Sequence, residues 1–426
     1  MEITKLIHKV FRKLKYIFSL PHEQNLKLFF KKLPSNLMRL KLRFIYENKS
    51  LRNTTTLELP NYDIINLGNK LSDEVLFRYK DKYQSSKYRF LFQVPPDGLG
   101  IIWFSDLIQT LEHTGISCAS VKWNDPKFEQ VWETFHPNIF ITLDLPIVLK
   151  SLDLDYINSY KTKYGCMRLF TPVNKYDFPN YEMNSEDKWR FNLACTGQTA
   201  DAYFCMFVNE FYSQFWKEWE EFGFKYLSLP HGCNPIYQYP REAKKDLDFF
   251  MATSHSDERL KLTWQYMNPI FRKYHGLWAG AGWDFGLGLM DSKQLPDFYA
   301  RAKVIPNPLA RFLINFPSEI TERAFSATAC GAFQITDWTP VTERFFSADE
   351  LITARSNEEF LNKFEYYIKH GEERDQIITN GMKHVFSEHT YFHRIDKLIA
   401  FLDNNSDLFY SPQKKDNQNK QKNNCD

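Results

Sequence analysis

The chain carries, from residue 319 to residue 337, the run Glu319-Ile-Thr-Glu-Arg-Ala-Phe-Ser-Ala-Thr-Ala-Cys-Gly-Ala-Phe-Gln-Ile-Thr-Asp337. Its first half predicts a helix, with Ser318 placed to cap the start and Gly331 placed to end it. Residues 332–336 predict a short buried strand that ends at Asp337. Because the first turn of a helix leaves backbone N–H groups without partners, the start near Glu319 can bind an anion. Many α/β domains contain such a unit without a phosphate site, so shape alone does not assign one.

The first half of the chain predicts a second α/β unit. Residues 88–94 form an expected buried strand, a loop with Gly98 and Gly100 follows, and residues 101–113 and 116–121 form an expected helix and strand. Strand, glycine-rich loop, helix and strand make the first βαβ unit of a doubly wound fold, in which ligands bind at the carboxyl ends of strands. Gly98 and Gly100 let the backbone approach a ligand closely, and Asp97 is expected to line the same cleft.

Two blocks of residues resemble the C-terminal donor-binding motif of GT-B glycosyltransferases, in particular the CgeB-like (spore-maturation-protein) group. The first block matches an acidic-Arg-x-Phe-Glu-Ala-x-Ala-Cys-Gly pattern followed by a strand that ends in Thr-Asp. Its matching residues are Glu322, Arg323, Phe325, Ala327, Ala329, Cys330, Gly331, Thr336 and Asp337. The second block comprises Glu372, Glu373, Arg374, Gly381, His389-Thr390-Tyr391 and Arg394. The resemblance covers residues 232–402 and implies a two-domain glycosyltransferase with a nucleotide-sugar donor and no obligatory metal or other cofactor.

The sequence departs from this pattern at one position. Retaining GT-B enzymes usually place a Glu five residues before the glycine, where it holds the donor ribose, and this chain has Ser326 there. Glu319 and Glu322 lie about one turn earlier and can partly substitute, because residues three to four apart share a helix face. The substitution leaves open whether the site is altered or inactive.

The resemblance implies how the donor would be bound. The leaving diphosphate would contact the helix start near Glu319, through backbone N–H groups around Ile320, Thr321 and Glu322. Arg323 either adds positive charge there or forms a surface salt bridge. Trp283 either stacks on a sugar or base or packs in the core. The candidate donor-binding residues are Gly98, Gly100, Trp283, Ser318, Glu319, Ile320, Thr321, Glu322, Arg323 and Ser326.

Asp97 and His231 are the candidate catalytic residues, because they are the titratable groups nearest the expected cleft loops. An inverting enzyme needs a general base on the acceptor hydroxyl, whereas a retaining enzyme needs none in that role. A His in a Pro-His-Gly turn is also a common loop residue. We expect no metal site, since Asp153-Leu-Asp155 and Asp246-Leu-Asp248 are weak matches to a metal-binding pair and the seven cysteines have no metal-ligand spacing.

The complete expectation is an α/β chain with two Rossmann-like doubly wound domains of GT-B type. A basic amphipathic helical extension spans residues 1–52, an acceptor-side domain residues 53–235, a nucleotide-sugar-binding domain residues 236–403, and a disordered tail residues 404–426. Residues 53–73 predict a β-leaning bridge into the acceptor-side domain. Residues 380–403 predict a closing helix, and the resemblance to GT-B enzymes implies that this helix crosses back to the acceptor-side domain. The net charge is +2, yet residues 1–52 hold a clear excess of Lys and Arg.

The extension defines the expected partners and location. Ile3, Leu6, Ile7, Val10 and Phe11 recur at helical spacing among lysines and arginines. This pattern favours docking on an anionic membrane surface, or a helix packed on the protein body. Scattered cysteines and the absence of a signal-type apolar run predict a cytoplasmic protein, with the inner face of the membrane as a candidate site. The expected partners are a nucleotide sugar and a glycan, lipid-linked or small acceptor. The alternatives are a catalytically silent GT-B-like module that binds a glycan or protein, and, ranked last, a nucleic-acid-binding protein; we expect no nucleic-acid partner.

Overall fold

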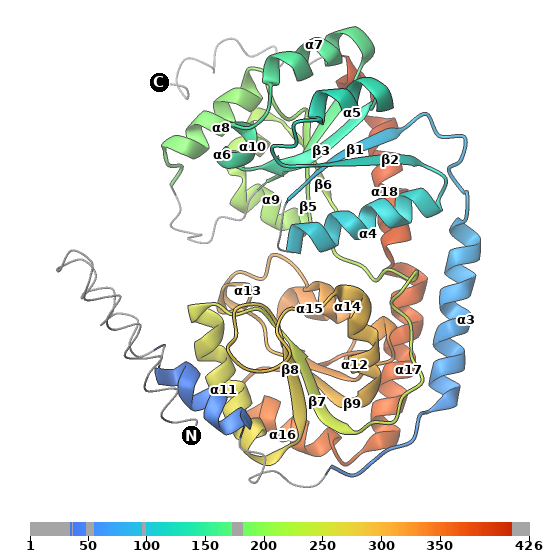
Figure 1. Ribbon diagram of the computed structural model, residues 1–426, viewed down its shortest axis with the longest axis vertical. Helices are drawn as coiled ribbons and strands as arrows, with labels where there is room; N and C mark the ends of the chain where they lie inside the picture. Colours follow the sequence, from blue (N-terminus) through green and yellow to red (C-terminus); the bar gives the residue numbers. More distant parts are fainter. Residues whose placement is uncertain (1–34, 36, 48–54, 96–98, 173–181, 411–426) are drawn as a thin grey trace, which may run out of the picture.

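The computed structural model describes residues 35, 37–47, 55–95, 99–172 and 182–410. It has two lobes, each built on a parallel sheet with helices on both faces (Figure 1). The first sheet has the strand order β2-β1-β3-β4-β5-β6 and the second has the order β11-β10-β9-β7-β8. This confirms the expected fold class of two doubly wound α/β domains.

The strands of the first sheet are β1 (Arg89–Val94), β2 (Ser117–Lys122), β3 (Ile139–Asp144), β4 (Met167–Pro172), β5 (Ala202–Cys205) and β6 (Lys225–Ser228). Those of the second are β7 (Leu247–Ala252), β8 (Gly276–Ala279), β9 (Ala302–Asn307), β10 (Gln334–Asp337) and β11 (Ile352–Ala354). Side chains alternate between faces, so Phe90 and Phe92 of β1 pack in one cluster and Leu91 packs in another. In each sheet the order reverses beside the first strand, and these reversals, β1/β3 and β7/β9, are the topological switch points.

The helices of the first lobe are α3 (Tyr62–Tyr79), α4 (Leu99–His113), α5 (Phe128–Phe135), α6 (Pro146–Leu149), α7 (Leu154–Tyr164), α8 (Ser185–Cys195), α9 (Asn209–Phe215) and α10 (Lys217–Phe222). The later helices are α11 (Asp257–Lys273), η2 (Ser292–Gln294), α12 (Leu295–Arg301), α13 (Arg311–Asn315), α14 (Glu322–Ala329), α15 (Pro340–Phe345), α16 (Asn357–Tyr367), α17 (Gly371–Glu388), α18 (Tyr391–Asn404) and η3 (Ser406–Phe409). None of the described helices is both long and apolar enough to span a membrane.

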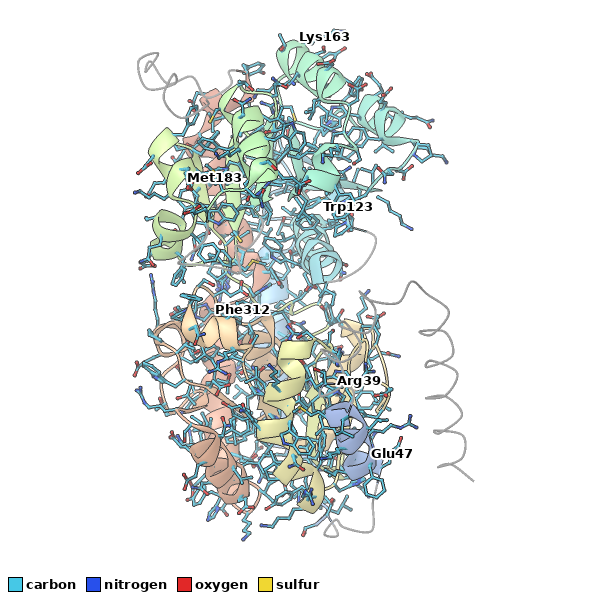
Figure 2. All side chains as sticks on the ribbon, turned by 90° about the vertical axis from the view of Figure 1, so that its left-hand side faces the viewer. Arg39, Glu47, Trp123, Lys163, Met183 and Phe312 are labelled. Carbon is cyan, nitrogen blue, oxygen red and sulfur yellow. The ribbon has the colours of Figure 1, made fainter. Side chains whose placement is uncertain are left out.

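The described part of the N-terminal extension is a helix at residues 37–47 that packs on the second lobe. Leu42 and Ile45 are buried in the core of that lobe, and the Tyr46 ring packs against Phe271 with centroids 5.4 Å apart. Arg39 lies 3.4 Å from a carboxylate oxygen of Asp284, and Figure 2 shows Arg39 and Glu47 on this helix beside the lower lobe. Residues 1–34, which carry most of the amphipathic pattern, lie outside the described residues.

Three segments connect the lobes. The chain passes from β6 to β7 through residues 229–246, and α17 and α18 carry it back to the first lobe (Figure 1). Helix α3 runs beside both of them: Asn61 Nδ2 donates to Asp375 on α17 (2.8 Å), and the Tyr79 hydroxyl donates to Asp396 on α18 (2.6 Å). The expectation of β-leaning structure across residues 53–73 is therefore wrong, because Asn61 caps a long helix that begins at Tyr62.

The C-terminal end differs from the expectation in two ways. The closing helix is broken at His389, and Thr390 caps α18 through a capping box with His393. Residues 404–410, which we assigned to a disordered tail, are packed: Leu408 and Phe409 are buried against the first lobe, and Lys161 Nζ donates to the carbonyl oxygen of Phe409 (3.1 Å). Apolar Leu408 and Phe409 explain the difference, since they have a hydrophobic surface to cover. Residues 411–426 lie outside the described residues.

Candidate functional site

The carboxyl edge of the second sheet brings several of the expected residues together at the switch point between β7 and β9. Arg323 Nη1 donates to Asn307 Oδ1 at the end of β9 (2.7 Å), and Arg323 Nη2 donates to the carbonyl oxygen of Ala252 at the end of β7. Asn307 Nδ2 in turn lies 3.5 Å from the hydroxyl of Thr321. Arg323 therefore ties the start of α14 to the two strands between which a doubly wound sheet binds its ligand.

Among the described residues Arg323 forms no ion pair, and its charge opposes the rise in the pKa of neighbouring Glu322. The side chain is half-buried, and within the described ranges no Asp or Glu oxygen lies within 4.0 Å of its nitrogens. A partly buried cation is normally paired. Of the two expected uses of Arg323, the structure does not show the surface salt bridge among the described residues; the guanidinium is held as a fixed cation at the carboxyl edge of the second sheet.

Helix α14 begins later than the sequence predicts. Its first helical residue is Glu322 and its N-cap is Thr321, whose side chain makes no capping hydrogen bond. Ser318 is not the cap, because its carbonyl oxygen accepts from the N–H of Val208 (2.9 Å) in the other lobe, which holds the preceding loop out of the helix. Among the described residues, the backbone N–H groups of residues 320–323 donate to no carbonyl or side chain. They are the unsatisfied donors that the first turn of a helix leaves.

The far end of α14 agrees with the sequence. Gly331 has a φ of +69°, and its N–H bonds the carbonyl oxygen of Thr328 (3.0 Å). Since this left-handed conformation favours glycine, Gly331 ends the helix as predicted and turns the chain into β10. The small residues before it are buried: Ala324, Ala327 and Ala329 all lie within the core. Ile320 is buried in the same core rather than exposed to a ligand.

Two acidic side chains stand near the start of α14. Glu322 Oε1 accepts from Gln238 Nε2 (3.3 Å), and burial raises the pKa of Glu322, against the effects of Ser326, Arg323 and Gln238 beside it. Glu319 Oε2 is buried and has no hydrogen-bond partner among the described residues, and burial raises the pKa of Glu319 to about 7. Burial thus disfavours the charged form of both carboxyls, and that of Glu319 most clearly.

Ser326 lies one turn after Glu322 on α14. Its side chain is 2% exposed, and its hydroxyl makes no hydrogen bond to a described residue. A buried hydroxyl without a partner is uncommon and marks a place where a ligand or water can bind. The pair therefore offers a carboxylate and a hydroxyl on adjacent turns, in place of the single Glu of the GT-B pattern.

Trp283 packs in the core. It is 8% exposed, its indole Nε1 donates to the carbonyl oxygen of Thr253 (2.7 Å), and its ring contacts Trp278 with centroids 5.1 Å apart. The indole N–H bonds the loop after β7, and the ring packs against Trp278, His255 and Phe285. Of the two expected uses of Trp283, the structure favours packing over stacking on a sugar.

His231 lies where the linker leaves the first sheet. Its Nδ1 is 3.4 Å from the Tyr391 hydroxyl and its ring packs edge-on against Trp103. Burial and the nearby Arg394 guanidinium lower the pKa of His231 to about 4, so the ring is neutral at pH 7 and only weakly basic. Gly100 lies in the first turn of α4, whereas Asp97 and Gly98 lie outside the described residues.

The residues of the second sequence block are structural. Arg394 donates to the carbonyl oxygens of Pro230 (2.7 Å) and His231 (2.8 Å), and so fixes the start of the linker. A Cβ on Gly232 would lie 2.8 Å from the carbonyl oxygen of His389, and one on Gly381 would lie 2.5 Å from that of Glu350. Arg374 bonds the carbonyl oxygen of Ile368 (3.2 Å) and the carboxylate of Glu58. These residues set how closely α17, α18 and the linker pack.

His384, Glu388 and His389 are the described groups nearest to a metal-binding arrangement. Arg394 Nη2 lies 3.2 Å from His389 Nδ1, and since arginine only donates, His389 must carry its hydrogen on Nε2. That nitrogen lies 3.2 Å from His384 Nε2, and His384 Nδ1 lies 2.8 Å from Glu350 Oε2. The contacts form one directed chain from Arg394 to Glu350 that uses the ring nitrogens a metal would need.

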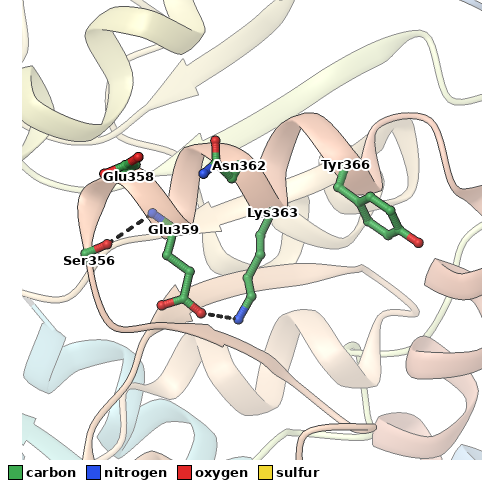
Figure 3. Close-up of a pocket in the computed structure, with 6 residues that line it drawn as sticks. All are labelled: Ser356, Glu358, Glu359, Asn362, Lys363 and Tyr366. Atoms are coloured by element: carbon green, nitrogen blue, oxygen red, sulfur yellow. Dashed lines mark hydrogen bonds and ion pairs between the residues drawn. The ribbon is translucent and has the colours of Figure 1, made fainter.

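A surface hollow on α16 is separate from these residues (Figure 3). It is lined by Ser356, Glu358, Glu359, Asn362, Lys363 and Tyr366. Glu359 pairs with Lys363 at 2.6 Å, and the Glu359 N–H donates to the Ser356 hydroxyl (3.1 Å). Because these groups satisfy one another on a helix flank, the hollow offers a ligand little polar recognition.

Several residues near the site were missed in the sequence. They are Asp106, Asn234, Tyr237, Gln238 and Asn307. Asp106 was inside an expected helix, and the sequence assigned no role to the other four. Only Asn307 carried a usable signal, since it follows a buried strand whose carboxyl end faces the ligand edge.

Comparison with known proteins supports the assignment of the fold. Residues 264–400, about a third of the chain, match a family model described as glycosyl transferase-like. Anabaena Alr3699/HepE, solved with UDP and glucose, aligns over 74% of this chain and 100% of its own with a TM-score of 0.50 and 10% identity. Sucrose-phosphate synthase (tll1590) of Thermosynechococcus elongatus aligns over 74% and 98% with a TM-score of 0.50 and 13% identity. A search of curated protein sequences finds no match. The chain thus has the two-domain GT-B glycosyltransferase fold, and its second half matches a glycosyl transferase-like family.

Proposed function

We propose that the protein is a glycosyltransferase that moves a sugar from a nucleotide-sugar donor to a glycan, a lipid-linked glycan or a small acceptor. The observation that carries the proposal is the start of α14. There an unpaired guanidinium and a run of orphan N–H groups meet at the switch point of the second sheet. Together these groups fit a diphosphate.

The chemistry follows from where charge develops. Breaking the bond between the sugar and the diphosphate places negative charge on the leaving phosphate, and fixed donors at that point lower the barrier. Arg323 and residues 320–323 supply such donors without a metal, so we propose that activity needs none. The Anabaena structures contain UDP and UDP-glucose, and uridine nucleotides are therefore the first donors to test.

The domain roles extend this proposal. We assign residues 236–403 to donor binding and residues 53–235 to the acceptor, whose cleft would include Asp97, Gly98 and Gly100. Glu322 and Ser326 together would bind the donor ribose in place of the usual Glu. Asp97 and His231 remain the candidate bases for an inverting reaction; with a pKa of about 4, His231 would be the weaker. The sequence motifs lead us to place the chain in the CgeB-like group.

Calorimetric titration tests the proposal. The purified chain is titrated with UDP, ADP, GDP and CDP and with UDP-glucose, with a chelator present. We expect metal-independent binding of one nucleotide family, weakened about tenfold or more by Arg323→Met or Glu322→Ala. Arg311→Met, on the exposed first residue of α13, is the matched control and should bind as the wild type does. Absence of binding by folded wild-type protein across the panel would overturn the proposal.

A catalytically silent GT-B-like module is the second candidate. Ser326 favours it, because the carboxylate expected at that position is missing and the buried hydroxyl has no partner. Binding of a nucleotide sugar without hydrolysis or transfer to any offered glycan would support this reading. Turnover of the bound donor would exclude it.

We also propose that residues 1–52 dock on an anionic membrane surface at the cytoplasmic face. In the described helix at residues 37–47, Leu37 and Phe44 are 52% and 68% exposed beside exposed Lys41. Co-sedimentation with vesicles containing phosphatidylserine should fall on Phe44→Ser and with rising salt. Phe77→Ser, which removes an 86%-exposed ring on α3, is the control. Equal sedimentation of both variants and the wild type would contradict membrane docking through this helix.

A further inference from the structure

A buried hydrogen-bond network crosses the boundary between the two lobes and ends at Glu322. It begins at Asp106 on α4, whose Oδ1 accepts from Asn234 Nδ2 and from the Tyr237 hydroxyl, both at 2.8 Å. Gln238 Nε2 donates to the Tyr237 hydroxyl (3.2 Å) and to Glu322 Oε1 (3.3 Å). The network thus joins a helix of the first lobe, the linker and the first residue of α14.

The directions of these bonds fix the orientation of Gln238. Its Oε1 accepts from the backbone N–H of Asn234 (2.7 Å), so its amide nitrogen must face Tyr237 and Glu322. The Tyr237 hydroxyl gives its hydrogen to Asp106 and accepts from Gln238. Gln238 is therefore the source of donation in both directions, to Tyr237 and through it to Asp106 on one side and to Glu322 on the other, and it presents a donor, never an acceptor, to that carboxylate.

Burial makes the network rigid. Asp106, Asn234 and Gln238 are 1%, 0% and 3% exposed. Since a buried polar group without partners is costly, each of these side chains is held in one orientation. Glu322, at the end of the network, is only half-buried and uses Oε1 for Gln238, so Oε2 can accept hydrogen bonds from a ligand.

We propose that Gln238 is a positioning residue for the donor site. It holds the Glu322 carboxylate in the orientation that binds the donor ribose, and Asp106 and Tyr237 anchor it across the lobe boundary. This inference rests on the proposed function, because it gives Gln238 a role through Glu322. It adds that recognition of the ribose depends on residues of the linker and of the first lobe, outside the nucleotide-binding domain.

The test compares ribonucleotides with their 2′-deoxy and 3′-deoxy forms. If Glu322 binds ribose hydroxyls, the wild type should prefer UDP, or whichever of ADP, GDP and CDP binds, about tenfold over one deoxy form. Gln238→Met, similar in size but unable to hydrogen-bond, should reduce that preference to about twofold. Tyr237→Phe should reduce it in the same direction by less. Gln376→Met, on the surface of α17 where Gln376 donates to Asn380, should leave it unchanged.

The discrimination ratio separates positioning from a loss of stability, because a loosened fold weakens both nucleotides alike. An unchanged ratio in folded Gln238→Met protein, with Glu322→Ala still abolishing the preference, would overturn the inference and leave the proposed function intact. Failure of the wild type to bind any nucleotide would instead overturn the proposed function, and the inference with it. Should Gln238→Met fail to fold, the ratio in Tyr237→Phe decides: no reduction there overturns the inference.

Discussion

Glu319, just before α14, is a buried acidic residue whose charge state should affect stability. Its carboxyl has a buried oxygen without a partner, and burial raises the pKa of Glu319 from 4.5 to about 7. A carboxyl with a raised pKa favours folding below its unfolded pKa, and this contribution is lost as the pH rises to about 7. We therefore compare the free energy of unfolding of Glu319→Gln with that of the wild type. The difference should change in favour of Glu319→Gln by roughly 1–3 kcal/mol as the pH rises from 4.5 to 8.

Urea unfolding at several pH values measures this gain. Glu358→Gln provides the control, since Glu358 is exposed on α16 and its replacement should change stability equally at every pH. A difference between Glu319→Gln and the wild type that is flat from pH 4.5 to pH 8 would show that Glu319 is ionised in the folded protein.

Single residues of the site were predictable where local backbone chemistry decides them. Gly331 ends α14 because its conformation favours glycine, and the sequence alone shows it. The role of Gln238 was not predictable, because its partner Glu322 lies 84 positions away in the chain. Arg323 was a candidate from the sequence, but its hydrogen bonds to Ala252 and Asn307 could be identified only from the structure.

At the scale of helices and strands, the distinction between local and distant contacts explains which predicted helix boundaries were wrong. Ser318 has the right side chain for an N-cap, yet its carbonyl bonds Val208 in the other lobe, and α14 starts at Glu322 instead. By contrast, the start of α3 at Asn61 and the restart of the closing helix at Thr390 both have ordinary capping residues. These two signals were present in the sequence and could have been used.

The contact between α14 and α17 leads to a prediction at this scale. Gly381 lies in α17, and a Cβ there would lie 2.5 Å from the carbonyl oxygen of Glu350 and 2.9 Å from Thr328 Cγ2 on α14. Gly381→Ala should therefore destabilise the protein by roughly 1–2 kcal/mol, since the clash exceeds the gain in helix propensity. Thermal unfolding measures the effect.

Gly371→Ala is the matched control on the same helix. A Cβ at position 371 would lie 3.5 Å from Arg374 Nη2, which is an ordinary contact. The Gly371→Ala protein should therefore be as stable as the wild type or slightly more stable. If Gly381→Ala is as stable as Gly371→Ala, α17 can move away from Glu350 at little cost, and its close packing does not fix α14.

At the scale of the whole molecule, the two lobes are joined by contacts between distant parts of the sequence. Helix α18 completes the core of the first lobe with Ile395, Leu398 and Leu402, although it follows the second lobe in the chain. The linker bonds the start of α18, where the backbone N–H of Tyr391 donates to the carbonyl oxygen of Cys233 (2.8 Å). The sequence predicted a closing helix at residues 380–403, and the resemblance to GT-B enzymes predicted that this helix crosses back to the first lobe.

The last segment that the structure describes allows a test of this arrangement. Residues 404–410 follow α18 and cover the first lobe, where Leu408 and Phe409 are 3% and 7% exposed. Lys161 Nζ donates to the Phe409 carbonyl oxygen and pairs with Asp201 at 3.2 Å, so the segment also covers a buried charge. Ending the chain after Asp403 should cost roughly 3–6 kcal/mol of the free energy of unfolding of the first lobe, because two apolar side chains and the Lys161 acceptors are lost together.

Chemical unfolding of two shortened chains measures how much residues 404–410 stabilise the first lobe. A chain that ends after Tyr410 retains every contact of the segment and should match the full-length protein, whereas the chain that ends after Asp403 should unfold at lower denaturant. If the shorter chain does not fold, Phe409→Ala in the full chain should still cost about 3–4 kcal/mol. Equal stability of all these proteins would mean that α18 alone completes the first lobe, and that residues 404–410 rest on its surface without holding it closed.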